Sequence, residues 1–321
     1  MRMIVTGGLG FIGSNFINYW LSQYPEDHIV NVDKMTYASD PANISDPNNG
    51  NYQFVKADIL DKERIGELVR DSDTIINFAA ESHVDNSISS PEQFLQSNYM
   101  GVFNLLEYVR KYDLRFHQVS TDEVYGSLPL NSSDSFDEHS PYNPRNPYSA
   151  TKAAADFLVR SYVNTYGIKA TISNCSNNFG PNQHPEKLIP KTILNAIEGK
   201  KIPVYGDGLQ IRDWIFVEDH CTALDLVLKK GKVGETFLVS SRGEKRNIDV
   251  VTEILRILNL PEKLIEFVED RPGHDVRYSI NPKKIEEKLG WKPKHNFKDA
   301  LKFTVEHYVK NVGKYRAIYS R

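Results

Sequence analysis

The N-terminal residues Arg2-Met-Ile-Val-Thr-Gly-Gly-Leu-Gly-Phe-Ile-Gly13 give the clearest indication of the fold. Its first residues predict a short buried strand, and the residues after it predict a helix, because apolar side chains recur at helical spacing at Phe11, Ile12, Phe16, Ile17, Trp20 and Leu21. Glycines between the two permit a tight turn and let the backbone approach a pyrophosphate, which the helix N-terminus attracts. We therefore predict that Gly7, Gly10 and Gly13 bind a dinucleotide, with a glycine turn that holds no ligand as the alternative.

A second strand is predicted from His28 to Asp33, and its last residue stands roughly 20 residues after Gly13, as the dinucleotide-binding pattern requires. The carboxylate of Asp33 is expected to accept hydrogen bonds from ribose hydroxyls, and its charge disfavours a 2′-phosphate. The predicted cofactor is therefore NAD rather than NADP, although the neighbouring Lys34 weakens that preference.

The chain goes on alternating between strand and helix patterns. Predicted strands at 52–55, 73–80, 114–119 and 168–174 separate predicted helices at 61–70, 91–112 and 147–166. This order predicts an α/β fold: a Rossmann-type doubly wound parallel sheet with a smaller, mixed α/β C-terminal lobe that binds substrate. We assign residues 1–180 to the NAD-binding domain, to which segments near 210–240 return, and residues 181–321 mainly to the lobe.

The composition is ordinary for a soluble globular protein: 321 residues, 40% hydrophobic and 25% charged. A net charge of −3 does not indicate a nucleic acid or a membrane as partner. Cys175 and Cys221 are too few for a disulfide framework and stand in no metal-binding motif, so no metal site is predicted. Because no apolar run approaches membrane-spanning length and a strand begins near Met3, we expect a cytoplasmic protein.

A hydroxyl and two adjacent carboxylates follow the predicted strand 114–119, in Val119-Ser-Thr-Asp-Glu-Val-Tyr-Gly126. Ligands of open α/β sheets bind just beyond the carboxyl ends of the strands, so these side chains are expected to face a ligand. Two close carboxyl groups can have pKa values pushed apart, which gives one acid and one base, here Asp122 and Glu123. A polar turn capped by Asp122 is the alternative.

Tyr148 and Lys152 are four residues apart at the start of the predicted helix 147–166, so they point from one helical face. A nearby ammonium group is expected to lower the pKa of the phenol, which would make Tyr148 a base near neutral pH. A pair of this kind is common on helix surfaces, but here it follows a dinucleotide-binding turn and a hydroxyl at a strand end. We therefore favour a catalytic pair.

Other predicted strand ends also carry polar groups. His83 follows the strand 73–80, and the amides of Asn177 and Asn178 follow the strand 168–174. Three arginines in the C-terminal half are candidates for clamping a diphosphate, with surface salt bridges as a nearly equal alternative, namely Arg212, Arg271 and Arg277. The Ser-, Asn-, Asp- and Pro-rich segment 127–146 is predicted to be a loop over the site.

The predicted helix 91–112 has more apolar surface than one neighbouring layer covers, because a second face carries Tyr99, Met100, Phe103 and Tyr108. A homodimer through the long helices near 91–112 and 147–166 is therefore expected.

The motif Thr6-Gly-Gly-x-Gly-Phe-Ile-Gly13 together with Tyr148-x-x-x-Lys152 resembles the extended short-chain dehydrogenase/reductase superfamily, in its nucleotide-sugar branch. Further motifs resemble the dTDP-glucose 4,6-dehydratase family over nearly the whole chain, namely Ala80-Glu-Ser-His-Val-Asp85, Ser120-Thr-Asp-Glu-Val-Tyr-Gly126, Asn174-Cys-Ser-Asn-Asn-Phe-Gly-Pro181, Pro185-Glu-Lys-Leu-Ile-Pro190, Gln210-Ile-Arg-Asp-Trp214 and Asp270-Arg-Pro-Gly-His274. The resemblance implies a lyase that holds NAD tightly and acts on dTDP-glucose in deoxysugar (rhamnose-type) synthesis.

The resemblance also implies roles for individual residues. Tyr148, assisted by Lys152, is the base on the sugar 4-hydroxyl, which Thr121 holds; Asp122 protonates the departing 6-hydroxyl and Glu123 removes the C5 proton. Implied NAD contacts are Gly7, Gly10, Phe11, Ile12, Gly13, Asp33, Lys34, Thr36, Asp58, Ile59, Ala79, Ala80, Ser82, Ser97, Tyr148, Lys152 and Asn178. Implied substrate contacts are Ser82, His83, Thr121, Asn177, Lys187, Leu188, Pro203, Val204, Tyr205, Arg212, Asn247, Asp270, Arg271 and His274.

Three residues depart from the family pattern: Asn86 replaces an arginine, Phe179 a tyrosine, and Asn182 the tyrosine after the Gly-Pro turn. None is at a catalytic position. Two other functions remain open at this point. One is a different nucleotide-sugar enzyme, such as a 4-epimerase, a decarboxylase or a dehydratase on another nucleotide; the other is a dinucleotide-sensing protein without catalysis.

Overall fold

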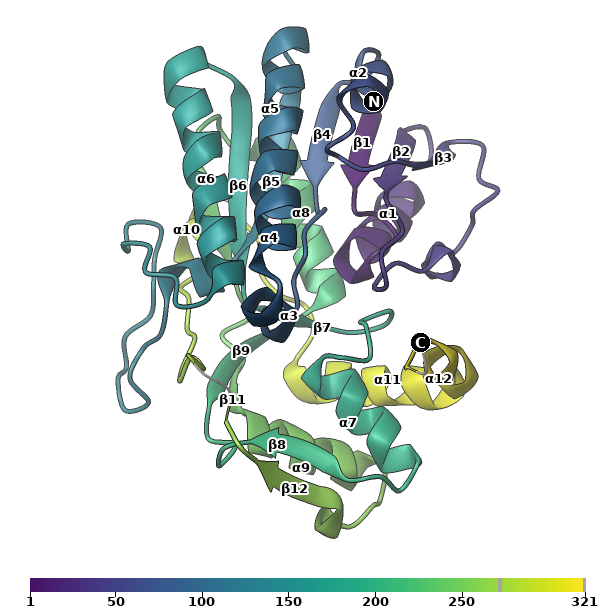
Figure 1. The fold of residues 1–321 in the computed structure, drawn as a ribbon, viewed down its shortest axis with the longest axis vertical. Helices are drawn as coiled ribbons and strands as arrows, with labels where there is room; N and C mark the ends of the chain where they lie inside the picture. The colour runs from purple at the N-terminus through teal and green to yellow at the C-terminus, as the bar shows by residue number, and fades with distance from the viewer. Residues whose placement is uncertain (271–272, 320–321) are drawn as a thin grey trace.

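The computed structural model describes residues 1–270 and 273–319. Its main feature is a seven-stranded sheet in the order β10-β6-β5-β4-β1-β2-β3, with every neighbouring pair parallel (Figure 1). The strands are β1 (Arg2–Thr6), β2 (His28–Asp33), β3 (Tyr52–Lys56), β4 (Thr74–Asn77), β5 (Arg115–Thr121), β6 (Lys169–Cys175) and β10 (Thr236–Val239). The order reverses between β1 and β4, as in a Rossmann fold, so the predicted fold class is confirmed.

Helices cover both faces of this sheet. α1 (Phe11–Gln23) and α8 (Val217–Lys230) bury Phe16, Ile17 and Leu224 against Met3 and Val5 on one face. The other face is covered by α2 (Lys62–Val69), α5 (Gly101–Tyr112) and α6 (Pro147–Tyr166). Apolar residues on both sides of β1 and β4 explain why these strands read as continuous hydrophobic runs.

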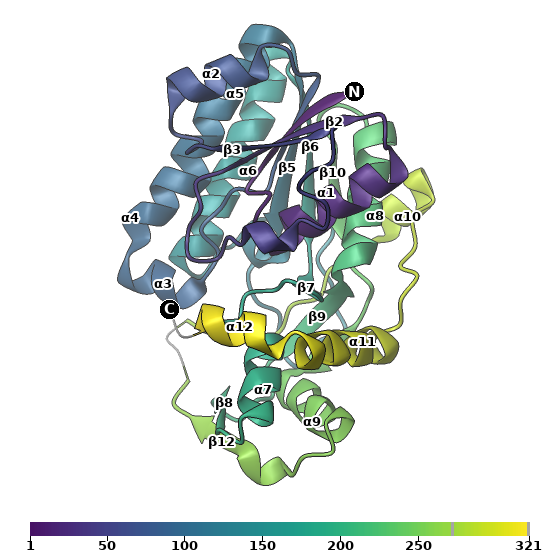
Figure 2. The same cartoon turned by 90° about the vertical axis from the view of Figure 1, so that its right-hand side faces the viewer.

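The later part of the chain forms a smaller lobe below the carboxyl ends of the sheet (Figures 1 and 2). Its helices are α7 (Leu188–Ile197), α9 (Asn247–Ile257), α11 (Phe297–Lys310) and α12 (Val312–Tyr319). Two small sheets complete it, β11-β9-β7 and β12-β8, with bounds Asn177–Phe179 (β7), Ile202–Tyr205 (β8), Ile211–Phe216 (β9), Glu244–Arg246 (β11) and Ile265–Val268 (β12). The chain returns to the large sheet through α8, β10 and α10 (Lys283–Leu289).

The segment predicted as one helix from 91 to 112 is not uniform. It consists of α4 (Pro91–Phe94), a π-helical turn (Leu95–Met100) and α5, and it follows a short helix α3 (Val84–Ser89) that was not predicted. In the π turn, the buried amide of Asn98 accepts the Glu81 N–H at 2.8 Å and donates to the Glu81 carbonyl at 3.0 Å. Hydrophobic periodicity cannot show such a turn, because the contacts that its residues make are with a distant loop.

Candidate active site

One cavity gathers the residues predicted to surround a cofactor and a reacting sugar. It lies at the carboxyl ends of the central strands, and residues 183–187 of the smaller lobe close one side. Its lining includes all the predicted cofactor and catalytic residues: Gly7, Gly10, Phe11, Ile12, Gly13, Asp33, Lys34, Thr36, Asp58, Ile59, Ala79, Ala80, Ser82, Ser97, Asn178, Thr121, Asp122, Glu123, Tyr148 and Lys152. This is where an open parallel sheet binds its ligand.

In the turn between β1 and α1, backbone atoms leave no room for a side chain at Gly7 and Gly13. Gly7 has a φ of +68°, and a Cβ there would lie 2.7 Å from the backbone nitrogen of Ala79. A Cβ at Gly13 would lie 2.5 Å from the Gly7 carbonyl oxygen. The N-terminus of α1 lines the cavity at Phe11, and its first turn contains no acidic residue. The turn therefore fits the pyrophosphate of a dinucleotide.

Asp33 is buried at the end of β2 and holds the loops around it. Its Oδ2 accepts the Leu9 N–H at 3.0 Å, and its Oδ1 accepts the Met35 N–H and the Ser39 hydroxyl, both at 2.8 Å. The Lys34 ammonium lies 3.5 Å from Glu81 and 4.0 Å from Asp58. Because two carboxylates already face this ammonium, the residues fit NAD better than NADP.

Asp122 and Glu123 begin a 3₁₀ turn (Asp122–Tyr125) directly after β5. Thr121 caps the turn: its Oγ1 accepts the Glu123 N–H at 3.3 Å and donates to Asp122 Oδ1 at 3.3 Å. Asp122 is only 2% exposed, and its Oδ2 has no hydrogen-bond partner within the described part of the chain. Burial, and then the charges of Glu123 and Asp213, raise the pKa of Asp122 well above its ordinary value. A proton-carrying carboxyl group beside a second carboxylate is suited to paired acid and base catalysis.

Tyr148 and Lys152 enter the cavity from the buried face of α6. The helix begins at Pro147 with a capping box, in which the Asn146 side chain accepts the Ser149 N–H at 2.8 Å. Lys152 Nζ donates to the Val119 carbonyl at 2.7 Å. Burial, followed by the charge of Glu123, raises the pKa of Tyr148 well above its ordinary value. The expected lowering of this pKa is therefore wrong, because burial and the charge of Glu123 outweigh the influences that lower it.

The two amides after β6 differ in their surroundings. Asn178 is held by the protein itself, since its Nδ2 donates to the Ser176 carbonyl at 2.9 Å and its Oδ1 lies 2.9 Å from His220 Nδ1. Asn177 also lines the cavity, and its buried Oδ1 has no partner among the described residues. Asn177 is thus the amide with an acceptor left for a ligand.

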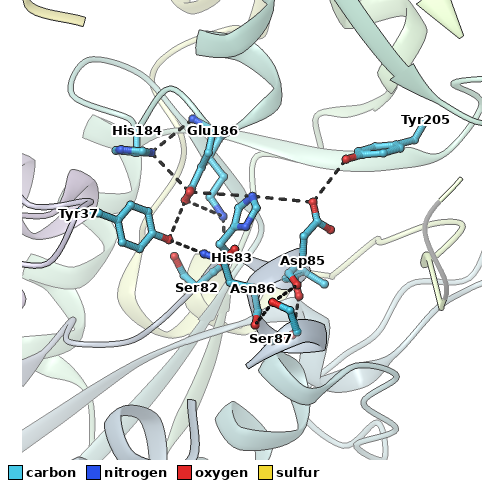
Figure 3. A network of polar contacts seen from close by, with 12 residues as sticks. Tyr37, Ser82, His83, Asp85, Asn86, Ser87, His184, Glu186 and Tyr205 are labelled. Carbon is cyan, nitrogen blue, oxygen red and sulfur yellow. Dashed lines mark hydrogen bonds and ion pairs between the residues drawn. The ribbon is translucent and has the colours of Figure 1, made fainter. Parts of the chain in front are cut away.

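A network of polar contacts joins the two lobes beside the cavity (Figure 3). We call Tyr37, His83, His184, Glu186 and Lys187 the inter-lobe network. One Glu186 oxygen accepts from the Tyr37 hydroxyl at 3.5 Å, and the other lies 3.6 Å from His184 Nδ1 and 4.0 Å from His83 Nε2. Burial alone would raise the pKa of Glu186, but the hydrogen bond with His184 and the nearby charges, Lys187 first, lower it.

Lys187 connects this network to the cavity wall, because its Nζ donates to the Ser82 carbonyl at 2.9 Å. Ser82 and Lys187 therefore meet at the cavity, as their predicted role as ligand contacts requires. His83 belongs to the network but not to the lining.

The other predicted substrate residues, all on the smaller lobe, do not line this cavity: Leu188, Pro203, Val204, Tyr205, Arg212, Asn247, Asp270 and His274. Tyr205 still reaches across, since its hydroxyl donates to Asp85 Oδ2 at 3.4 Å, and its ring meets that of His274 at a 6.2 Å centroid separation. Arg271 lies outside the described residues.

The arginines are bound within the lobe. Arg212 is 5% exposed, and its guanidinium donates to the carbonyls of Ile211 and Asp275 at 2.8 and 2.9 Å. Its charge also lowers the pKa of Asp122. Arg277 pairs with Glu244 at 2.7 Å, so it forms a salt bridge as the alternative expected, but a buried one, since Arg277 is 4% exposed.

The three departures from the family pattern have local explanations. Asn86 donates to the Tyr37 hydroxyl at 3.4 Å and so touches the inter-lobe network. Phe179 packs against the rings of Phe216 and Phe297 with centroid separations of 5.7 and 5.3 Å. Asn182 has a φ of +70°, which asparagine tolerates better than most residues.

Several cavity residues were given no role by the sequence, notably Glu81, Gln183, His184 and Glu186. Glu186 lies in the motif Pro185-Glu-Lys-Leu-Ile-Pro190 that resembles the family, but only its neighbours Lys187 and Leu188 were given a role. Among the described residues, no cluster of His, Cys, Asp or Glu side chains could hold a metal ion. Within the same residues, no helix combines the length and apolar character needed to cross a membrane.

Comparison with known proteins places these features in a family. The sequence profile of the family described as GDP-mannose 4,6 dehydratase matches residues 4–304. A dTDP-glucose 4,6-dehydratase of Mycobacterium tuberculosis is 46% identical over 99% of this chain and 96% of its own. The low-salt glycan biosynthesis protein Agl12 of Haloferax volcanii is 48% identical over 96% of this chain and 99% of its own. The dTDP-glucose 4,6-dehydratase DesIV of Streptomyces venezuelae, crystallised with NAD, is 40% identical with a TM-score of 0.96, covering 99% of this chain and 100% of DesIV.

Proposed function

This chain belongs to the dTDP-glucose 4,6-dehydratase family, and from that premise we propose that it is an NAD-dependent hydro-lyase that converts dTDP-glucose to dTDP-4-keto-6-deoxyglucose and water. The observation that carries the proposal is the buried Asp122 beside Glu123, in the same cavity as the glycine turn and Tyr148. Oxidation at C4 needs only the turn and the Tyr148–Lys152 pair. The two carboxyl groups are therefore available for elimination of water.

The cavity residues divide the proton transfers among themselves. When bound, NAD supplies a hydride acceptor for sugar C4, a hydride donor for C6 and a positive ring charge that favours a deprotonated Tyr148. Tyr148 takes the proton of the 4-hydroxyl, which Thr121 holds, and Lys152 stabilises the phenolate. The 4-keto group then acidifies the C5 proton.

Elimination falls to the two carboxyl groups. Glu123 removes the C5 proton, and Asp122 gives its proton to the 6-hydroxyl, which leaves as water. A proton then returns to C5 as C6 is reduced, so the net change is the loss of one water molecule. Each acid or base of this kind contributes about 10²–10⁴-fold to the rate.

The direct test offers the purified protein dTDP-glucose beside UDP-, CDP- and GDP-glucose and follows the 4-keto-6-deoxy product by its absorbance in alkali. We expect product from dTDP-glucose. Glu123→Gln should still reduce bound NAD with substrate but should not exchange solvent deuterium at C5. Normal turnover by this variant would remove Glu123 from the mechanism.

The assay also separates the other functions considered. A 4-epimerase needs no acid/base pair beside Thr121 and would yield an isomer without loss of water. If product forms only from another nucleotide sugar, the substrate carries that nucleotide instead of dTDP. A sensing protein would give no product from any of them, although its cavity would still bind NAD.

We further propose a homodimer through α4–α5 and α6, which lie side by side on one face of the sheet (Figure 1). Large apolar side chains are exposed there: Leu95 (52%), Met100 (41%), Phe157 (53%) and Tyr166 (47%). Burial of such side chains against a second copy of the chain would lower the free energy. We also propose a cytoplasmic enzyme of deoxysugar synthesis of the dTDP-rhamnose type, which agrees with two free, buried thiols, Cys175 and Cys221.

A further inference from the structure

Asp156 is a buried carboxyl group one helical turn beyond Lys152 on α6, and the proposed chemistry does not use it. Its side chain is fully buried. Its Oδ2 accepts from the Ser120 hydroxyl at 2.8 Å, the Tyr142 hydroxyl at 3.0 Å and the Asn174 amide at 3.1 Å. Its Oδ1 has no partner within the described part of the chain. Burying a carboxylate costs free energy, so we expect a carboxyl group that is held in the interior by three donors to have a function.

The hydrogen bonds of Asp156 lead to the end of β5, the strand directly before the turn that contains Asp122 and Glu123. Ser120 lies on β5 directly before Thr121. The Asn174 amide that donates to Asp156 also donates to the Thr121 carbonyl, again at 3.1 Å. Lys152 and Asp156 of α6 therefore connect to three successive residues of β5. Val119 and Ser120 are bonded directly, and Thr121 is connected through Asn174 of β6. These are the last residues before Asp122 and Glu123.

Asp156 also acts on Lys152 electrostatically. Burial lowers the pKa of Lys152, and the charge of Asp156 is the largest influence in the opposite direction. Other titratable groups that face the pair are Tyr125 in the 3₁₀ turn, Tyr142 in the loop and Cys175 at the end of β6, and burial raises the pKa of all three. Burial raises the pKa of Asp156 itself, and the charge of Lys152, the hydrogen bonds from Ser120 and Asn174 and the charge of Arg160 on the same helix act in the opposite direction.

We propose that Asp156 is a positioning residue that keeps Lys152 in its ammonium form and holds the end of β5 in register with it. The inference rests on the proposed function, since it concerns the Tyr148–Lys152 pair of that reaction. Asp156 itself does not line the cofactor cavity, although it accepts a hydrogen bond from Ser120, which does. Its effect on the rate is therefore indirect, through Lys152 and Thr121.

The test is Asp156→Asn, which keeps the shape and removes the charge. With less support for its ammonium form, Lys152 assists Tyr148 less, so deprotonation of Tyr148 needs a higher pH. We expect kcat to fall about tenfold near neutral pH, which corresponds to about 1.4 kcal/mol. The acidic limb of the kcat–pH profile should move to higher pH, while KM for dTDP-glucose and the bound NAD content stay within about twofold of wild type.

The sign of the pH shift separates this role from a structural one. A direct effect on Tyr148 would move the limb the other way, because loss of a nearby anion favours the phenolate. Tyr142→Phe is the matched control: it removes a hydrogen bond to the same carboxyl group and keeps the charge, so the limb should stay in place. An unmoved limb in Asp156→Asn, or an equal shift in the control, overturns the proposal. Absence of turnover by the wild type would instead refute the proposed function.

Discussion

Replacement of Asp122 by asparagine should separate the redox step from the elimination step. The amide has almost the same shape as the carboxyl group but cannot give a proton to the departing 6-hydroxyl. Because Tyr148, Lys152 and the glycine turn are unchanged, Asp122→Asn should still oxidise the sugar and reduce bound NAD. It should then stall before water is lost.

The size of the effect follows from the surroundings of Asp122. The side chain is 2% exposed, so bulk water cannot easily replace it as proton donor. A positioned acid is worth about 10²–10⁴-fold, or about 3–5 kcal/mol of barrier, and we expect kcat to fall within that range.

Asp122→Asn should raise the stability of the folded protein near neutral pH, although it lowers kcat. Burial raises the pKa of Asp122 in the folded protein, so the unfolded chain ionises first as pH rises. This carboxyl group therefore costs no stability below its unfolded pKa of about 4, and stability is lost as pH rises from there towards its folded pKa. Asp122→Asn removes this loss of stability. Near neutral pH its thermal midpoint should therefore exceed that of wild type, by about 2 °C for each 1.4 kcal/mol of unfolding free energy regained.

Three measurements test the prediction. Stopped-flow absorbance of NADH follows the oxidation, the alkaline absorbance of the keto product follows complete turnover, and thermal scans at pH 4 and pH 7 follow stability. If Asp122→Asn forms product at a rate near that of wild type, Asp122 is not the acid of the elimination. If its advantage in thermal midpoint is larger at pH 4 than at pH 7, the pKa of Asp122 is not raised in the folded protein.

Three further outcomes are expected from single changes. Gly13→Ala places a Cβ 2.5 Å from the Gly7 carbonyl, so purified protein should contain far less NAD; unchanged NAD content would show that the turn does not approach the pyrophosphate. Glu186→Gln removes the charge at the centre of the inter-lobe network, and we expect KM for dTDP-glucose to rise about tenfold with kcat nearly unchanged, whereas a fall in kcat alone would contradict a role in joining the lobes. Phe157→Glu places a charge on an exposed apolar face of α6, so light scattering should report a monomer; a variant that stays dimeric would place the interface elsewhere.

Much of the fold was predictable because its signals are local. The glycine turn, the acid at the end of β2 and the helical start at Pro147 are set by short stretches, and each element formed close to its predicted place. The division of the segment 91–112 was not predictable, since hydrophobic periodicity runs through it and the π turn contacts the distant Glu81 through Asn98. The additional helix α3 likewise lies in a segment without clear periodicity.

The chemical groups of the site could be identified from the sequence: the glycine turn, Asp33, the Thr121–Glu123 turn and the Tyr148–Lys152 pair. Each is recognisable because spacing along one element fixes which side chains share a face or a strand end. Their protonation follows from the folded structure, since burial and neighbouring charges raise the pKa values of Asp122 and Tyr148. The folded structure also revealed Glu186 and Asp156, whose partners lie on other elements. Those contacts depend on how helices and loops pack across the sheet, and no spacing along the chain encodes that directly.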